Sequence, residues 1–166
     1  MQTPTAGFTE PFESFYRREY GAMVALAAAV SGLPAASEDI AQEALLRAHR
    51  AWGKVSGYDK PGAWLRRITI NLASNQRRRA STERRLNRVA AAGRHTVDLE
   101  LRDEGVWGAV AKLPTKQRAA IALFYLEDRS VAEIAEILDC APNTAKAHLY
   151  QGRQALQAAL DREEML

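Results

Sequence analysis

The residues best suited to chemistry in this sequence are the arginines and amides of residues 63–79, AWLRRITINLASNQRRR. Trp64 and the aliphatic residues repeat at helical spacing and predict a buried face, which leaves the polar residues on the other sides. Arginines bind phosphates, and asparagine amides can hydrogen-bond to base edges. The stretch therefore predicts nucleic-acid contacts from Arg66, Arg67, Asn71, Asn75, Arg77 and Arg78.

The loop before this stretch, SGYDKPGAW, carries Tyr58, which could stack on an unpaired base as in proteins that bind single strands. The alternative for Tyr58 is a place in the core, and the two interpretations are evenly matched. For Trp64 the core is the better interpretation.

Positive charge is concentrated between Arg77 and His95, where seven arginines accompany a single acid, Glu83. The whole chain of 166 residues has a net charge of +3, so the rest of it is slightly acidic. A concentrated basic segment indicates a polyanionic partner, although a solvated run of charges would give the same pattern.

The stretch from Ser130 to Arg153 has the pattern of a helix-turn-helix. Ser130 and Glu133 can form a capping box, Asp139-Cys140-Ala141 is a tight turn, and Pro142 suits the first position of the next helix. Such a second helix enters the major groove, although helical bundles contain the same pattern. The candidate duplex contacts are Asn143, Thr144, Lys146, His148 and Arg153, with Arg118, expected to be exposed, from the preceding helix.

Asp39 and Glu43 lie four residues apart and could share a cation, form a docking surface, or be a solvated acidic face. We expect no metal there, because the three histidines are scattered. The single cysteine, Cys140, excludes a disulfide within the chain and a cysteine-based zinc cluster, and indicates a reducing compartment. Cys140 is more typical of core packing than of catalysis. No phosphate-binding loop or nucleophile motif is present, so an enzyme is disfavoured.

The elements that position these residues are all helices. Residues 12–30 form the first, Ser37 is expected to cap the second, and the third runs from Pro61 or Gly62 to about Arg79. In the second half, Ile121, Phe124 and Tyr125 are expected to face inward. The sequence predicts an all-α protein with two small helical domains, 10–79 and 99–160, joined by a basic flexible linker, 80–98, which could start as a helix.

The segment RREYGAMVALAAAVSGLPAA resembles a secretory signal, but it begins at Arg17, after two acids. Its apolar run is shorter than the roughly 20 residues that span a bilayer. A buried helix is the better interpretation, so we expect no membrane insertion.

Two stretches resemble the conserved domains of the extracytoplasmic-function (ECF) sigma factors, which are sigma-70 family group 4 subunits of bacterial RNA polymerase. DIAQEALLRAHRAW with GAWLRRITINLASNQRRR is similar to the first domain, sigma region 2. LPTKQRAAIALFYLEDRSVAEIAEILDCAPNTAKAHLYQGRQAL is similar to the second, sigma region 4. Their order, their spacing and the linker agree with the family over about residues 10–160.

The resemblance implies a promoter-specificity subunit. It would bind core RNA polymerase, through its clamp and flap regions, by way of Asp39, Gln42, Glu43 and, more weakly, Arg47. The third helix and Tyr58 would melt and bind the −10 element, with Asn71 at the matching asparagine. The helix after the turn would bind the −35 duplex. The family often has Gly, an apolar residue and Ser where this chain has Asp139, Cys140 and Ala141, and arginines in place of His148 and Gln151, which puts the −35 sequence in question.

The resemblance also implies a cytoplasmic protein without metal or organic cofactor, and it makes an anti-sigma factor a candidate partner. Two other hypotheses remain. A regulator with a LuxR-like helix-turn-helix would bind duplex DNA by itself, but it leaves residues 37–79 unexplained. An anti-regulator would keep the fold without the DNA contacts, and only the low charge of the helix after the turn supports it.

Overall fold

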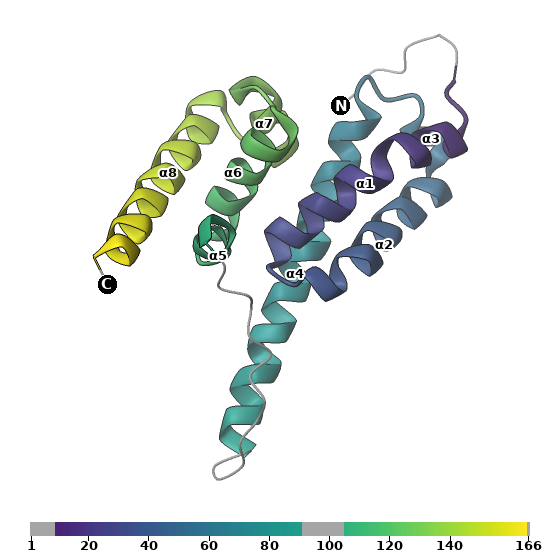
Figure 1. The fold of residues 1–166 in the computed structure, drawn as a ribbon. Helices are drawn as coiled ribbons and strands as arrows, with labels where there is room; N and C mark the ends of the chain where they lie inside the picture. The colour runs from purple at the N-terminus through teal and green to yellow at the C-terminus, as the bar shows by residue number, and fades with distance from the viewer. Residues whose placement is uncertain (1–8, 91–104, 166) are drawn as a thin grey trace.

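The computed structural model describes residues 9–90 and 105–165, and all regular structure in these ranges is helical, which confirms the all-α prediction (Figure 1). No helix in the described ranges combines the length and apolarity needed to span a bilayer. The elements are α1 (Phe12–Ser31), the 3₁₀ turn η1 (Pro34–Ala36), α2 (Ser37–Arg50), α3 (Trp52–Val55), α4 (Pro61–Ala90), α5 (Gly105–Ala111), α6 (Thr115–Glu127), α7 (Val131–Leu138) and α8 (Pro142–Glu164).

The first half of the chain is a bundle in which α1 packs against both α2 and α4. Phe15, Met23, Leu45 and Leu65 are fully buried between these helices. Helix α1 ends at Gly32, whose φ of 66° lies in the left-handed region and whose N–H bonds to the carbonyl of Ala28. The chain then turns back into α2.

The start of α2 differs from the prediction. Ser37 is the first residue of the helix rather than its cap, and its hydroxyl donates to the carbonyl of Pro34. The 3₁₀ turn η1 leads directly into the helix, so the preceding position is Ala36, which has no capping side chain. Glu38 and Asp39 do lie in the first turn, where they complement the helix dipole.

Helix α4 continues beyond its predicted end near Arg79 to Ala90. Residues 80–89 contain no Gly or Pro and several good helix formers, so nothing in them stops the helix. The first part of the predicted linker is therefore helical, and its remainder lies outside the described residues. This end of α4 extends beyond the bundle, and Leu86 and Val89 on it are exposed (Figure 1).

The second half of the chain contains the predicted helix-turn-helix, formed by α7 and α8. The capping box is present: the Glu133 N–H bonds to the Ser130 hydroxyl, and the Glu133 carboxylate accepts the Ser130 N–H. Asp139 ends α7 with a φ of 54°. Gly152 lets α8 approach α6 closely, because a Cβ there would come within 2.9 Å of Ile121.

Two predictions for α6 are wrong. Arg118 was expected on the surface but is 2% exposed, and Tyr125 was expected inside but is 57% exposed. The reason is that α6 packs against α1 as well as α7 and α8, so five consecutive residues, 119–123, are all buried. A helix that is buried on several sides has no single apolar stripe to detect in the sequence.

The two halves also pack against each other. Helix α1 contacts α5 and α6, and α4 contacts α7. The buried apolar residues of both halves form one continuous cluster. Figure 1 shows α1, α2 and α4 on one side and α5 to α8 on the other.

Candidate nucleic-acid interface

A stripe of polar side chains runs along the exposed face of α4. Asn71, Asn75, Arg78 and Arg79 are all exposed, and their spacing of three and four residues places them on one side of the helix. The Nη2 of Arg78 donates to the Asn75 Oδ1 at 2.5 Å. The stripe therefore combines amides, which can bond to base edges, with guanidiniums, which can bond to phosphates.

This stripe borders a groove of about 450 Å³ between α2 and α4. The groove brings together two sets of residues that the sequence assigned to different partners, the acidic face of α2 and the amides of α4. Gln76 and Arg79 also line it, although they were not predicted. Arg79 could have been found, because it continues the four-residue series from Asn71 and Asn75. The predicted residues in the groove are Asp39, Glu43, Arg47, Asn71 and Asn75.

The outer face of α2 is polar and acidic. Asp39 and Gln42 are exposed, and the Arg47 Nε donates to the Glu43 carboxylate at 3.1 Å. This ion pair joins exposed side chains and contributes little to stability. Asp39 and Glu43 outnumber Arg47, so the face suits a basic partner. The described residues contain no cluster of three or more potential metal ligands.

Four predicted nucleic-acid contacts are engaged inside the protein instead. Arg66 is 4% exposed, and Arg118, at 2%, donates to the carbonyls of Val30 and Leu113. Burial, with a smaller effect of nearby Arg77, lowers the pKa of Arg118 to about 10, so it remains protonated at neutral pH. Arg77 donates to the carbonyls of Ser31 and Ala111, and Arg67 donates to two carbonyls at the end of α7. In this arrangement these four side chains are occupied by partners within the protein and are not free to contact a nucleic acid.

Tyr58 is half-buried beside a cleft of about 960 Å³ that lies between the loop before α4 and the turn before α8. Trp64 is also half-buried, and it packs against the core, as its sequence pattern indicated. Cys140 is half-buried on the opposite wall of the cleft and also packs against the core.

Helix α8 presents its first turns to solvent. Asn143, Thr144 and Lys146 are exposed, and His148 is half-buried. Arg153 is exposed but held in place, because its Nε donates to the Tyr125 hydroxyl at 2.9 Å and its guanidinium lies 4.6 Å from the Phe124 ring centre. The N-terminal residues of such a helix contact base edges, so the accessible part of α8 is the part suited to that role.

Two family models match separate parts of the chain. The family model for sigma-70 region 2 matches residues 15–83, and that for sigma-70 region 4 matches residues 104–156. The chain is 31% identical to the ECF RNA polymerase sigma factor SigW of Bacillus subtilis over 144 residues, which cover 75% of each protein.

The chain belongs to the ECF sigma factors.

Other relatives are sigma factors too. ECF sigma factor SigM of Mycobacterium tuberculosis is 29% identical over 93% of this chain and 80% of its own length. The RNA polymerase sigma-H factor of Pseudomonas aeruginosa is 32% identical over 75% of this chain and 72% of its own. This ECF sigma factor is thus an alternative sigma factor that directs transcription initiation. The LuxR-like alternative is not favoured, because it leaves the region 2 match unexplained.

Two solved structures resemble this ECF sigma factor over most of its length. CnrH, in complex with the cytosolic domain of CnrY, has a TM-score of 0.64 at 26% identity, covering 91% of this chain and 88% of CnrH. The sigma factor RpoE in complex with the anti-sigma factor NepR, from Bartonella quintana, has a TM-score of 0.61 at 24% identity, covering 90% of this chain and 96% of RpoE. The second likeness concerns the fold alone.

Proposed function

We propose that this sigma factor binds core RNA polymerase through the outer face of α2. Asp39 and Gln42 are exposed there, and Glu43 lies beside them with its partner Arg47. A rigid helix with a net negative face can pair with basic residues of the polymerase, and such complementarity sets specificity and association rate.

The exposed stripe of α4 contacts the melted −10 element in this proposal. Asn71 hydrogen-bonds to a base that has left the stack, while Asn75 and Arg78 follow the strand. Unstacking a base costs a few kcal/mol, which contacts with the protein must offset. Tyr58 lies near the start of α4 and supplies an aromatic surface for stacking.

The first turns of α8 contact the −35 duplex in the major groove. Asn143 and Thr144 are placed to contact base edges, and Lys146 to contact phosphates. This helix has few charges for a DNA-binding element. In the proposal α8 helps to position the sigma factor on the promoter but supplies little of the affinity, because polymerase already holds the first half of the chain.

The observation that carries the proposal is the groove between α2 and α4. It places the acidic face that suits polymerase beside the amides that suit a single strand. A subunit that holds the enzyme and the melted strand on adjacent helices couples promoter recognition to initiation. A regulator that acts on duplex DNA alone needs no such arrangement.

The experiment is transcription with purified core polymerase on a library of double-stranded promoters, followed by sequencing of the transcripts. Initiation from a defined set of promoters supports the proposal. Duplex binding without polymerase and without initiation indicates a regulator of the second class. Polymerase binding without any transcript contradicts the initiation role and indicates an anti-regulator.

The proposed function also bears on where the protein acts and on whether it catalyses a reaction. A polymerase subunit acts where the chromosome is transcribed, so we place this chain in the cytoplasm, and we assign it no catalytic reaction of its own. An anti-sigma factor is a candidate partner, because CnrH, which is 26% identical to this chain, was solved in complex with a protein partner, the cytosolic domain of CnrY.

A further inference from the structure

An apolar cavity of about 440 Å³ lies where the end of α1 meets α5 and the end of α6. Small residues of α1, namely Ala25, Ala28 and Ala29, line it together with Trp107 of α5 and Leu126 of α6. Trp107 and Leu126 are 44% and 40% exposed, so these large apolar side chains are only partly covered. The volume lies within the range of small-molecule sites, about 300–1,000 Å³, and such sites combine an apolar lining with a few polar groups.

The charged groups of the cavity wall have one sign. Arg77 of α4 and Lys112, which follows α5, both line the cavity. The other described residues of the wall are uncharged, and no carboxylate is among them. The cavity therefore combines an apolar space with a positive region.

Arg77 is half-buried in this wall. Its guanidinium donates to the carbonyls of Ser31 and Ala111. Burial, with a smaller effect of Arg84, lowers the pKa of Arg77 below its ordinary value. Within the described ranges no carboxylate pairs with Arg77, so its charge is compensated only by carbonyl dipoles.

A second buried cation lies behind Arg77. Arg118 is 2% exposed and donates to the carbonyls of Val30 and Leu113, each of which adjoins a residue of the cavity wall. Its Nη2 has no hydrogen-bond partner among the described residues. Arg77 is close enough to contribute to the lowered pKa of Arg118. Two neighbouring cations thus share one region of the interior.

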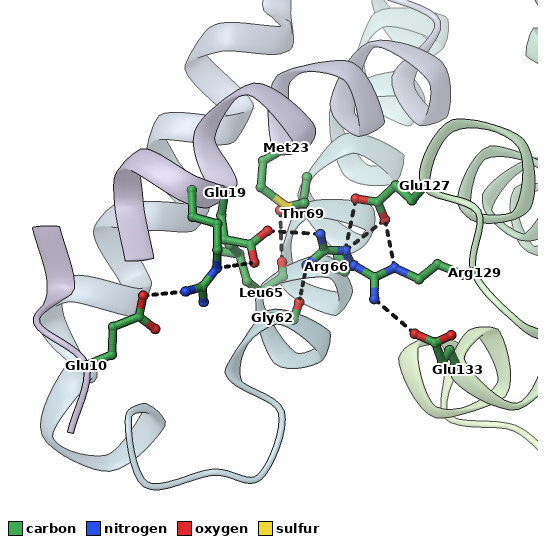
Figure 2. A network of polar contacts seen from close by, with 11 residues as sticks. Glu10, Glu19, Met23, Gly62, Leu65, Arg66, Thr69, Glu127, Arg129 and Glu133 are labelled. Atoms are coloured by element: carbon green, nitrogen blue, oxygen red, sulfur yellow. Dashed lines mark hydrogen bonds and ion pairs between the residues drawn. The ribbon is translucent and has the colours of Figure 1, made fainter. Parts of the chain in front are cut away.

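Arg66 shows how the same fold balances a buried arginine. The Arg66 Nη2 donates to the Glu19 Oε2 at 2.9 Å, and its Nε donates to the Glu127 Oε2 at 2.8 Å (Figure 2). These carboxylates outweigh the effect of burial and raise the pKa of Arg66. Burial of a charge is costly unless the charge is paired. By this contrast, the region around Arg77 and Arg118 suits an anion.

We propose that the cavity binds an amphipathic monocarboxylate, such as a medium-chain fatty acid. The carboxylate pairs with Arg77, and Lys112 and Arg118 add to the positive potential. The apolar chain lies among the alanines of α1, Trp107 and Leu126. This site is independent of the proposed function, because it uses no residue assigned to promoter DNA or polymerase in that proposal.

The chemistry of the wall favours a carboxylate over other anions. The planar fork of an arginine matches the two oxygens of a carboxylate. A phosphate dianion would carry a larger charge into an apolar space, which costs more to desolvate. A single negative charge on an apolar body therefore fits the cavity best.

The test is isothermal titration of the full chain at neutral pH with decanoate, kept below the concentration at which it forms micelles. Decanol has the same chain without the charge, and acetate has the charge without the chain. Because a hydrogen bond to a charged group is lost with decanol, it is expected to bind about tenfold more weakly than decanoate. Acetate is expected to give no measurable binding. Decanoate is also expected to raise the melting temperature, since it binds the folded chain.

Ala28→Leu fills the cavity without changing any charge. It is expected to abolish decanoate binding, because the leucine side chain occupies the space of the apolar chain. Ala155→Leu is the matched control, since Ala155 is exposed on α8 and does not line the cavity. The control is expected to bind decanoate like wild type.

Arg77→Met keeps an apolar side chain of similar length but removes the charge. Its affinity for decanoate is expected to fall about tenfold, to that of decanol, while its affinity for decanol is unchanged. Arg17→Met is the control, because Arg17 forms an exposed pair with Glu13 on the surface. Circular dichroism checks that the helices are retained. The comparison of decanoate, decanol and acetate on wild-type protein needs no variant, so it decides the proposal even if Arg77→Met does not fold.

Three results overturn the proposal. Wild-type protein that does not bind decanoate leaves the cavity to an apolar side chain of a protein partner. Equal affinity for decanoate and decanol removes the recognition of the anion. Decanoate binding by Ala28→Leu that matches Ala155→Leu places the ligand outside the cavity. Promoter-specific initiation by the same protein preparation would leave the sigma function standing in each case.

Discussion

Helices α4 and α8 are both proposed to contact DNA, but they hold their polar residues in different ways. On α4 the side chains divide by face: Asn71, Asn75 and Arg78 are exposed, whereas Arg66 is buried in an ion-pair network. On α8 the polar side chains of Asn143, Thr144 and Lys146 in the first turns are exposed, and Arg153 is fixed against aromatic rings. Helix α4 is thus supported by buried ion pairs of Arg66 with Glu19 and Glu127, whereas the first turn of α8 has no capping side chain.

The difference teaches that the number of arginines in a sequence does not tell how many of them are available to bind DNA. Arg66, Arg77 and Arg118 bind internal carboxylates and carbonyls in this structure. The proposed DNA-binding surface of α4 consists of two amides, Asn71 and Asn75, and two arginines, Arg78 and Arg79. That of α8 consists of two small polar residues and Lys146. The two surfaces therefore differ less in exposed positive charge than the arginine counts of their sequences indicate.

The largest effect is expected from Arg66→Met, which tests the buried ion pairs that support α4. The variant leaves Glu19 and Glu127 buried without their shared cation, and loss of one partner from a buried network costs about 3–5 kcal/mol of stability. Urea unfolding at neutral pH measures this. Arg17→Met is the control, because both members of its pair are exposed and its cost is below about 1 kcal/mol. Equal unfolding midpoints for the two variants would contradict a supporting role for Arg66.

Asn71→Ala tests the exposed side of α4. A lost base contact of about 1–3 kcal/mol predicts a slowing of promoter opening by roughly 10- to 100-fold, with polymerase binding unchanged. Rates of open-complex formation and equilibrium binding to core polymerase measure the two effects. Gln42→Ala on α2 is the converse control, with weaker polymerase binding. Equal loss of both properties in Asn71→Ala would remove its base-contacting role.

Ala141→Ser tests the first turn of α8. Ala141 occupies the N-cap position without a side-chain hydrogen bond, and Ser there would satisfy an unpaired N–H of the first turn. We expect stabilisation of about 0.5–2 kcal/mol, seen as slower hydrogen exchange at the amides of Asn143 and Thr144. Ala147→Ser, at an exposed position in the second turn of the same helix, is expected to give no such protection. Unchanged exchange in Ala141→Ser would show that the end is already ordered by other contacts.

The smallest expected effect concerns the capping box of α7. The Glu133 carboxylate is hydrogen-bonded to Arg129 and to the backbone and hydroxyl of Ser130. These bonds hold the pKa of Glu133 below its ordinary value. A lowered carboxyl pKa stabilises the fold above the unfolded-state pKa, and this contribution is lost as the pH falls through the folded-state pKa.

Glu133→Gln is therefore expected to be less stable than wild type at pH 6 and closer to it at pH 3. Because the side chain is exposed to solvent, the difference at pH 6 stays below about 1 kcal/mol. Thermal unfolding at the two pH values measures it. A stability gap that is independent of pH would assign the effect to shape rather than to charge.

The sequence predicts individual helices better than their mutual packing. The capping box at Ser130 and the turn at Asp139 follow from local chemistry, and both are present. The burial of Arg118 could not be predicted, because it depends on α1 packing against α6 from a distant part of the chain. The groove between α2 and α4 was missed for the same reason, although the four-residue spacing of Asn75 and Arg79 pointed to one face.

The most direct test of the account is photo-crosslinking from two positions in the complex of the protein, core polymerase and a promoter obtained from the library. A crosslinker at Asn75 of α4 is predicted to react with the non-template strand at the −10 element. One at Lys146 of α8 is predicted to react about 25 base pairs upstream, in duplex DNA at −35. Crosslinks from both positions to a single element, or no crosslink from Asn75 to the melted strand, would contradict the assignment of two separate DNA-binding surfaces.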